Sequence, residues 1–147
     1  MDRPKTFTLD EAQMLVPVLK SLLKTAMEGK RLIEQVERES QELNRRINAS
    51  GGFHVDIVAR ARRVAARDKA LQETKDALAE IDSIGVQVKD LDIGLLDFPC
   101  IIDGEIVLLC WKYNEDTIQY WHGLEEGFRG RKLIDERIRG KKKEKPN

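Results

Sequence analysis

The sequence predicts an α+β fold, in which a long antiparallel, coiled-coil-like helical hairpin carries a small antiparallel β-sheet packed at its base. Apolar residues recur at alternating spacings of three and four between Ala12 and Ile47, which is the 3.5-residue period of helices that pack side by side. Asp103-Gly104 separates two β-rich runs, and this dipeptide is a strong signal for a two-residue hairpin turn. We therefore expect one domain over residues 1–136 and a disordered basic tail over residues 137–147.

The first predicted helix covers residues 8–48. Thr8 and Glu11 have the spacing of a capping box, in which each side chain accepts a hydrogen bond from the backbone amide of the other residue. Two glycines after residue 50 stop this helix, and a second helix is expected over residues 54–84. The apolar stripe is thin around residues 28–70, so the base of the hairpin should dock an apolar surface. The tip should project into water or meet a partner.

The predicted β module covers residues 86–131 and begins with a short alternating strand at residues 86–89. The turn at Asp103-Gly104 pairs Ile102 with Glu105, and this pairing fixes the register of the two longer strands. Side-chain alternation then defines two faces. The face that should cover the hairpin base carries Leu96, Phe98, Cys100, Val107, Leu109 and Trp111. The opposite face carries Asp97, Pro99, Ile101, Ile106, Leu108 and Cys110.

A third strand is expected over residues 117–122, after a second turn at residues 113–116. If this turn is centred on Asn114-Glu115, Leu109 pairs with Tyr120, and His122 joins the apolar face. If the register slips by one residue, His122 joins the face of Asp97 and Cys110 instead. We favour the first register, and the slipped register stays open as the alternative.

Composition and charge limit the classes of function. Charged residues make up 35% of the chain and aromatic residues 5%, which is typical of long helices more than of a compact enzyme. Residues 86–127 hold 2 basic and 9 acidic side chains, whereas residues 128–147 hold 9 basic and 3 acidic ones. We expect the basic tail to fold back on the acidic module or stay solvated, and we expect no nucleic-acid binding because the body is not basic.

Targeting signals and cysteine usage indicate the compartment. The first residues lack the apolar core of a signal peptide, and no run approaches the roughly 18 apolar residues of a membrane span. The two cysteines are expected to be free thiols, since they point to opposite faces of the sheet. These features predict a cytoplasmic protein with no membrane contact.

Six residues of the β module are candidates for ligand binding: Asp92, Asp97, Cys110, His122, Arg129 and Arg131. Cysteine, histidine and carboxylate are zinc ligands, but the sequence has no Cys-x-x-Cys or His-x-x-x-His, and the favoured register separates His122 from Cys110. Nucleophilic catalysis by Cys110 would need an adjacent base, which only the slipped register offers. Arg129 and Arg131 could bind an anion or form ion pairs with Asp92, Asp97 or neighbouring acids. We expect no catalytic residue, no cofactor and no metal.

Two classes of function remain. The favoured one is a non-enzymatic protein–protein interaction module with a coiled-coil arm, which self-associates as a homodimer. The alternative is a protein that binds a small ligand, an anion or a metal in the neighbourhood of Asp97, Cys110 and Arg131. The surroundings of the sheet face that carries Asp97 and Cys110 would distinguish these two classes of function. A face packed under another element favours the interaction module, and an open polar cleft favours the ligand-binding protein.

Several segments of the β module resemble those of a known family. They are Gly94-Leu-Leu-Asp-Phe-Pro99, Leu109-Cys-Trp111, Trp121-His122 and Gly127-Phe-Arg-Gly-Arg131. Together they resemble the domain of unknown function 2203 family of bacteria and archaea, and residues 8–90 resemble its helical part. Asn114 stands where the resemblance leads us to expect glycine. The resemblance supports the architecture and implies no activity.

Overall fold

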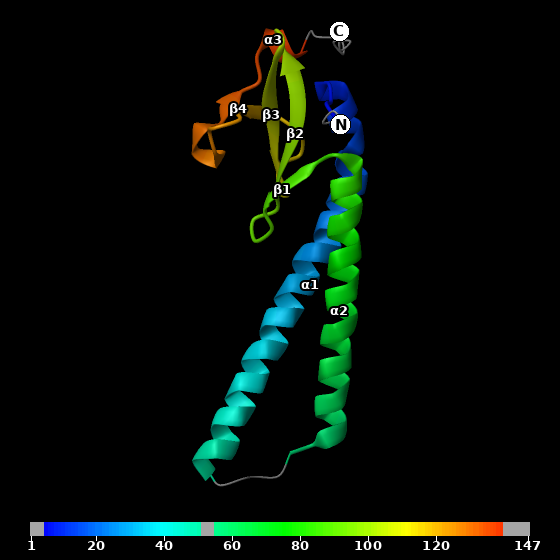
Figure 1. Cartoon of the computed structure of the whole chain (residues 1–147), viewed down its shortest axis with the longest axis vertical. Helices are drawn as coiled ribbons and strands as arrows, with labels where there is room; N and C mark the ends of the chain where they lie inside the picture. Colours follow the sequence, from blue (N-terminus) through cyan, green and yellow to red (C-terminus); the bar gives the residue numbers. More distant parts are fainter. Residues whose placement is uncertain (1–4, 51–54, 140–147) are drawn as a thin grey trace.

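The computed structural model describes residues 5–50 and 55–139 and confirms the predicted α+β fold. Helices α1 (Leu9–Ser50) and α2 (Ile57–Ile84) form the hairpin, and an antiparallel sheet of five strands in sequential order follows. The sheet lies beside the base of the hairpin, where α1 begins and α2 ends (Figure 1). The two helices project from this base as an arm and diverge toward its far end.

The ends of the helices follow local sequence signals. The capping box is formed as predicted, because Thr8 N–H donates to Glu11 Oε1 at 3.0 Å and Glu11 N–H donates to Thr8 Oγ1 at 3.1 Å. Asp56 caps α2 by accepting from Ala59 N–H at 3.0 Å. Gly85 ends α2 in the left-handed conformation, with φ 102°, which glycine adopts without steric cost. In the described part of the chain, no helix has the length and apolar character that crossing a membrane requires.

The contacts between α1 and α2 differ between the part of the hairpin toward the sheet and the part far from it. At the middle of α1, Gly29 lets the helices approach closely, since a Cβ at this position would lie 2.0 Å from Thr74 Oγ1. Farther out, ion pairs join the helices. Arg63 donates two hydrogen bonds to Glu39, at 3.0 and 2.8 Å, and Arg67 donates to Glu37 at 2.8 Å. The apolar contact is therefore concentrated at the base.

The strands of the sheet are β1 (Gln87–Asp90), β2 (Leu95–Ile102), β3 (Glu105–Lys112), β4 (Tyr120–Gly123) and β5 (Lys132–Leu133). The predicted β2–β3 hairpin is confirmed, with Ile102 paired to Glu105. The two turn residues have φ of 52° at Asp103 and 80° at Gly104. A turn with positive φ at both central positions matches the twist of the flanking strands, and Asp-Gly is suited to it.

The core lies between the inner face of the sheet and the hairpin base. Its fully buried members are Ala12, Leu19, Leu23, Ile81, Leu96, Phe98, Leu109 and Trp111. Trp111 also donates its Nε1–H to the Glu115 carbonyl at 2.9 Å, so its one polar atom is satisfied. This is the face that side-chain alternation predicted.

The register expected for the third strand is wrong, and the slipped alternative is correct. In the structure Leu109 pairs with Trp121 and Leu108 pairs with His122. The reason is that residues 113–119 form a longer connection instead of a two-residue turn. Within it, Ile118 is buried in the core, and its N–H donates to Gln13 Oε1 on α1 at 2.9 Å. The chain rejoins the sheet only at Tyr120.

The disordered tail is predicted to start at residue 137, which is too early in the chain. Residues Glu136–Arg139 form the short helix α3, and Ile138 is only 2% exposed within the core cluster. The N–H groups of Ile138 and Arg139 both donate to the Asp135 carbonyl at 3.1 Å, which fixes the turn that buries Ile138. One anchored apolar side chain is enough to extend the domain to this point. The rest of the expected tail, residues 140–147, lies outside the described residues.

Ile138→Ala should lower the free energy of unfolding by about 2–4 kcal/mol, because it leaves a cavity in the core. Leu133→Ala, in the same segment but 68% exposed, should change it by less than about 0.5 kcal/mol. Urea denaturation of both variants measures the difference. Equal effects of the two substitutions would contradict the placement of Ile138 in the core.

Candidate functional site

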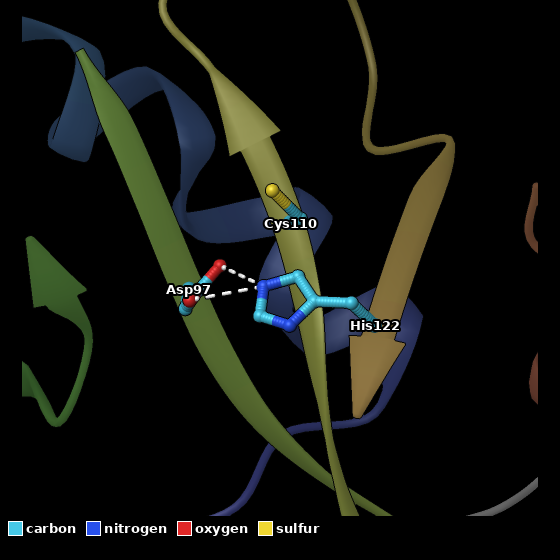
Figure 2. A group of neighbouring side chains, drawn as sticks. All are labelled: Asp97, Cys110 and His122. Carbon is cyan, nitrogen blue, oxygen red and sulfur yellow. Dashed lines mark hydrogen bonds and ion pairs between the residues drawn. The ribbon is translucent and has the colours of Figure 1, made fainter. Parts of the chain in front are cut away.

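Three chemically active side chains gather on the outer face of the sheet, one from each of three neighbouring strands. They are Asp97 on β2, Cys110 on β3 and His122 on β4, and all three point to the side away from α1 (Figure 2). Their potential ligand atoms all lie within 4.8 Å of one another. The side chains are almost fully buried, with 1%, 0% and 3% of their surface exposed. The slipped register creates this cluster.

Hydrogen bonding fixes the orientation of His122. Its Nδ1 lies 2.8 Å from the Gly123 carbonyl oxygen, which can only accept, so Nδ1 carries a proton and donates. Its Nε2 lies 3.1 Å from both carboxylate oxygens of Asp97. A neutral imidazole with its proton on Nδ1 presents a lone pair at Nε2, and an ionised carboxylate is also an acceptor. A proton carried by Nε2 or by Asp97, or a metal ion bound by both groups, would each satisfy this contact.

The donor set fits a transition-metal ion. A metal-binding histidine commonly donates its other ring N–H to a backbone carbonyl, as His122 does to Gly123. Tetrahedral Zn²⁺, with bonds of roughly 2.0–2.1 Å to nitrogen and oxygen, places two such ligand atoms about 3.3 Å apart. The observed separation between Nε2 and the Asp97 oxygens is 3.1 Å. Cys110 adds a softer third ligand. Within residues 5–50 and 55–139, no other group of three such side chains comes this close.

Cys110 is not arranged as a nucleophile. Burial raises the pKa of its thiol to about 12, and the nearby Asp97 carboxylate adds to this effect, while Arg131 opposes it. The thiol is therefore protonated at neutral pH in the metal-free protein. His122 cannot act as its base in this arrangement, because Nδ1 donates to Gly123 and Nε2 faces Asp97. A coordinated metal ion would reverse the balance and favour the thiolate.

A hollow of about 210 Å³ lies against Asp97 and His122 on the outer face. Its other lining residues are Lys89, Leu95, Leu108, Leu124, Glu126, Gly127 and Phe128. The segment after β4, which includes Phe128, thus covers part of this face, whereas the long helices α1 and α2 lie on the other side of the sheet. Asp97 and His122 therefore line a small pocket and Cys110 does not, an arrangement between the packed face and the open cleft that the sequence left as alternatives.

Arg131 forms an ion pair with the neighbouring acid Glu115 and not with Asp92 or Asp97. Its Nη2 donates to both carboxylate oxygens of Glu115, at 2.6 and 2.8 Å. The guanidinium carbon also lies 3.9 Å from the centre of the Tyr120 ring and 4.8 Å from that of Phe128. Arg131 therefore braces the segment that covers the pocket.

The remaining candidates lie outside the cluster. Asp92 is exposed and accepts from Lys30 Nζ at 2.5 Å, and Arg129 is exposed on the 3-10 helix η1 (Phe128–Gly130). The sequence did not indicate the roles of Lys89, Glu126 or the Gly123 carbonyl. Lys89 stands at a β-bulge and Gly123 acts through its backbone, and neither feature has a signature in the sequence.

In metal-free protein at about pH 8, near the pKa of an ordinary thiol, iodoacetamide should label Cys110 far more slowly than in the unfolded chain. A raised pKa keeps the thiol neutral to higher pH, so labelling should accelerate only as the pH approaches 12. Peptide mass spectrometry separates Cys110 from the equally buried Cys100. Labelling of native Cys110 at the rate of the unfolded chain would reveal an activated thiol.

Comparison with known proteins identifies the family. Residues 5–134 match the family described as "Uncharacterized conserved protein (DUF2203)", and the chain belongs to this family. The resemblance seen in the sequence is thereby confirmed. No curated protein and no solved structure matches the chain.

Proposed function

We propose that this protein binds a divalent transition-metal ion, foremost Zn²⁺, through Asp97, Cys110 and His122. The observation that carries the proposal is the buried contact of His122 Nε2 with the Asp97 carboxylate at 3.1 Å, while Nδ1 on the other side of the ring is held by the Gly123 carbonyl and Cys110 lies beside both groups. Imidazole nitrogen, thiolate sulfur and carboxylate oxygen together form a ligand set that suits zinc and its neighbours in the first transition row.

A shared proton between Asp97 and His122 is the competing explanation for this contact. Two considerations favour a metal ion. Burying ionisable groups costs several kcal/mol unless they are fully paired, and apolar residues in their place would often give a more stable sheet. Cys110 also interacts with Asp97, and its sulfur completes a set of three metal ligands that a proton shared by Asp97 and His122 does not need. The combination is therefore better explained by coordination.

Three protein ligands leave a coordination position open. Asp97 and His122 both line the pocket, so this position is expected on the pocket side. Zinc sites with three protein ligands characteristically take water or an exogenous ligand as the fourth. We accordingly propose a site that binds a further ligand, in contrast to a purely structural site. The two buried cysteines, neither of which forms a disulfide, support a location in the reducing cytoplasm.

After treatment with a chelator, the protein should bind one Co²⁺ or Zn²⁺ per chain, and Co²⁺ should give the absorption of a thiolate–cobalt bond. Cys110→Ala should abolish this absorption and weaken binding by more than the roughly 10–100-fold that loss of an outer hydrogen-bond partner costs. Cys100→Ala is the matched control, because Cys100 is equally buried but lies on the inner face. Metal analysis and absorption titration measure both. Absence of binding, or equal binding by the two variants, would refute the site.

Partner binding through apolar surface is a second candidate function. Ile57 and Val58, at the start of α2, are 78% and 60% exposed, and Met14 and Val18 on α1 are 81% and 51% exposed. Exposed apolar side chains close together in the sequence support a contact with another chain, and a homodimer is the simplest case.

Light scattering at micromolar concentration should give twice the 16.9 kDa of one chain. If the contact lies near the base, Val18→Asp should yield the monomer and Ile57→Asp should not. If it lies on the arm, the effects should be reversed. A mass of one chain for the unaltered protein would exclude the homodimer.

A further inference from the structure

Lys89 stands at an irregularity of the sheet edge. Val88 pairs with Leu96 and Asp90 pairs with Leu95, so Lys89 is an extra residue between two consecutive partners. Such β-bulges turn a side chain away from the regular strand direction and are frequent beside functional sites. Lys89 here lines the same pocket as Asp97 and His122, and it forms no ion pair with any other residue that the structure describes.

Apart from Lys89 and the proposed metal ligand Asp97, the charged residue that lines the pocket is Glu126, and its charge is already neutralised. Glu126 accepts from Lys132 Nζ and from Gly123 N–H, each at 2.9 Å. The Lys132 ammonium is the main reason why the pKa of Glu126 lies below its usual range, so its carboxylate is ionised and paired. Glu126 therefore leaves the positive charge of Lys89 without a counter-charge.

The charges of the metal site also balance. A divalent ion is neutralised by the Asp97 carboxylate and the Cys110 thiolate, while His122 coordinates as a neutral imidazole. The pocket beside the loaded site then holds one uncompensated charge, the ammonium of Lys89. Most of the remaining wall is apolar, formed by Leu95, Leu108, Leu124 and Phe128.

We propose that this pocket binds a small carboxylate, which coordinates the open position of the metal ion, pairs with Lys89 and places a short apolar body against the leucine and phenylalanine side chains. The inference rests on the metal site proposed above. A hollow of about 210 Å³ suits a small molecule. A monoanion matches the single uncompensated positive charge, and a cationic ligand would meet both the metal ion and Lys89.

The test uses the full-length protein loaded with Co²⁺, whose visible absorption changes when a ligand enters its coordination sphere. Propionate is the probe, and propionamide, which has nearly the same shape and no charge, is the control ligand. Propionate should change the spectrum saturably and propionamide should not. Lys89→Gln should retain one Co²⁺ per chain and lower the affinity for propionate by about tenfold or more.

Lys69→Gln is the matched control variant, since Lys69 is an exposed lysine on the arm. It should leave the affinity for propionate unchanged.

The outcomes separate the two proposals. If Co²⁺ does not bind, both are wrong. If Co²⁺ binds with the thiolate signature but propionate leaves the spectrum unchanged, the metal site stands and the carboxylate site is refuted. If propionate binds equally well to the unaltered protein and to Lys89→Gln, or if propionamide binds as well as propionate, the recognition of a carboxylate by Lys89 is refuted.

Discussion

The contact between the inner face of the sheet and the base of the helical hairpin is the constraint on which the other features depend. Phe98 and Trp111 on the sheet and Leu19 and Leu23 on α1 are fully buried in it. Two helices alone bury one narrow seam, and a small isolated sheet is only marginally stable. The hairpin and the sheet therefore stabilise each other. Since one face of every central strand is committed to this core, alternation assigns every second residue to the outer face. Asp97 and Cys110 lie there for this reason, and the register of β4 adds His122.

The parts of the fold that depend on neighbouring residues could be predicted from the sequence. The capping box of Thr8 and the turn at Asp103-Gly104 each need only a few residues, and the β2–β3 register follows from the turn. The position of β4 could not be predicted in this way. It depends on the hydrogen bond between Ile118 and Gln13, which are 105 residues apart, and on the burial of Ile118. An error of one residue there placed His122 on the wrong face and separated it from Cys110.

The cluster of Asp97, Cys110 and His122 has no recognisable sequence motif for the same reason. Zinc motifs are recognisable when two ligands share one turn or one helix, because their spacing is then fixed along the chain. Asp97, Cys110 and His122 each come from a different strand, and only the lateral register of three strands brings them together. The backbone carbonyl that orients His122 has no sequence signature at all. The brace formed by Arg131 and Glu115 adds a further long-range dependence, since it holds the segment that closes the pocket over the cluster.

The uneven construction of the hairpin gives its two halves different sensitivity to ionic strength. The base is held by apolar contacts, which simple salts at moderate concentration hardly weaken. The outer half relies on ion pairs such as Arg63–Glu39 and Arg67–Glu37, whose side chains are roughly one third to one half exposed. Mobile ions screen such charges over a Debye length of about 8 Å at physiological salt and about 3 Å at 1 M. Salt is therefore expected to loosen the outer half of the hairpin more than the base, whose contacts are apolar.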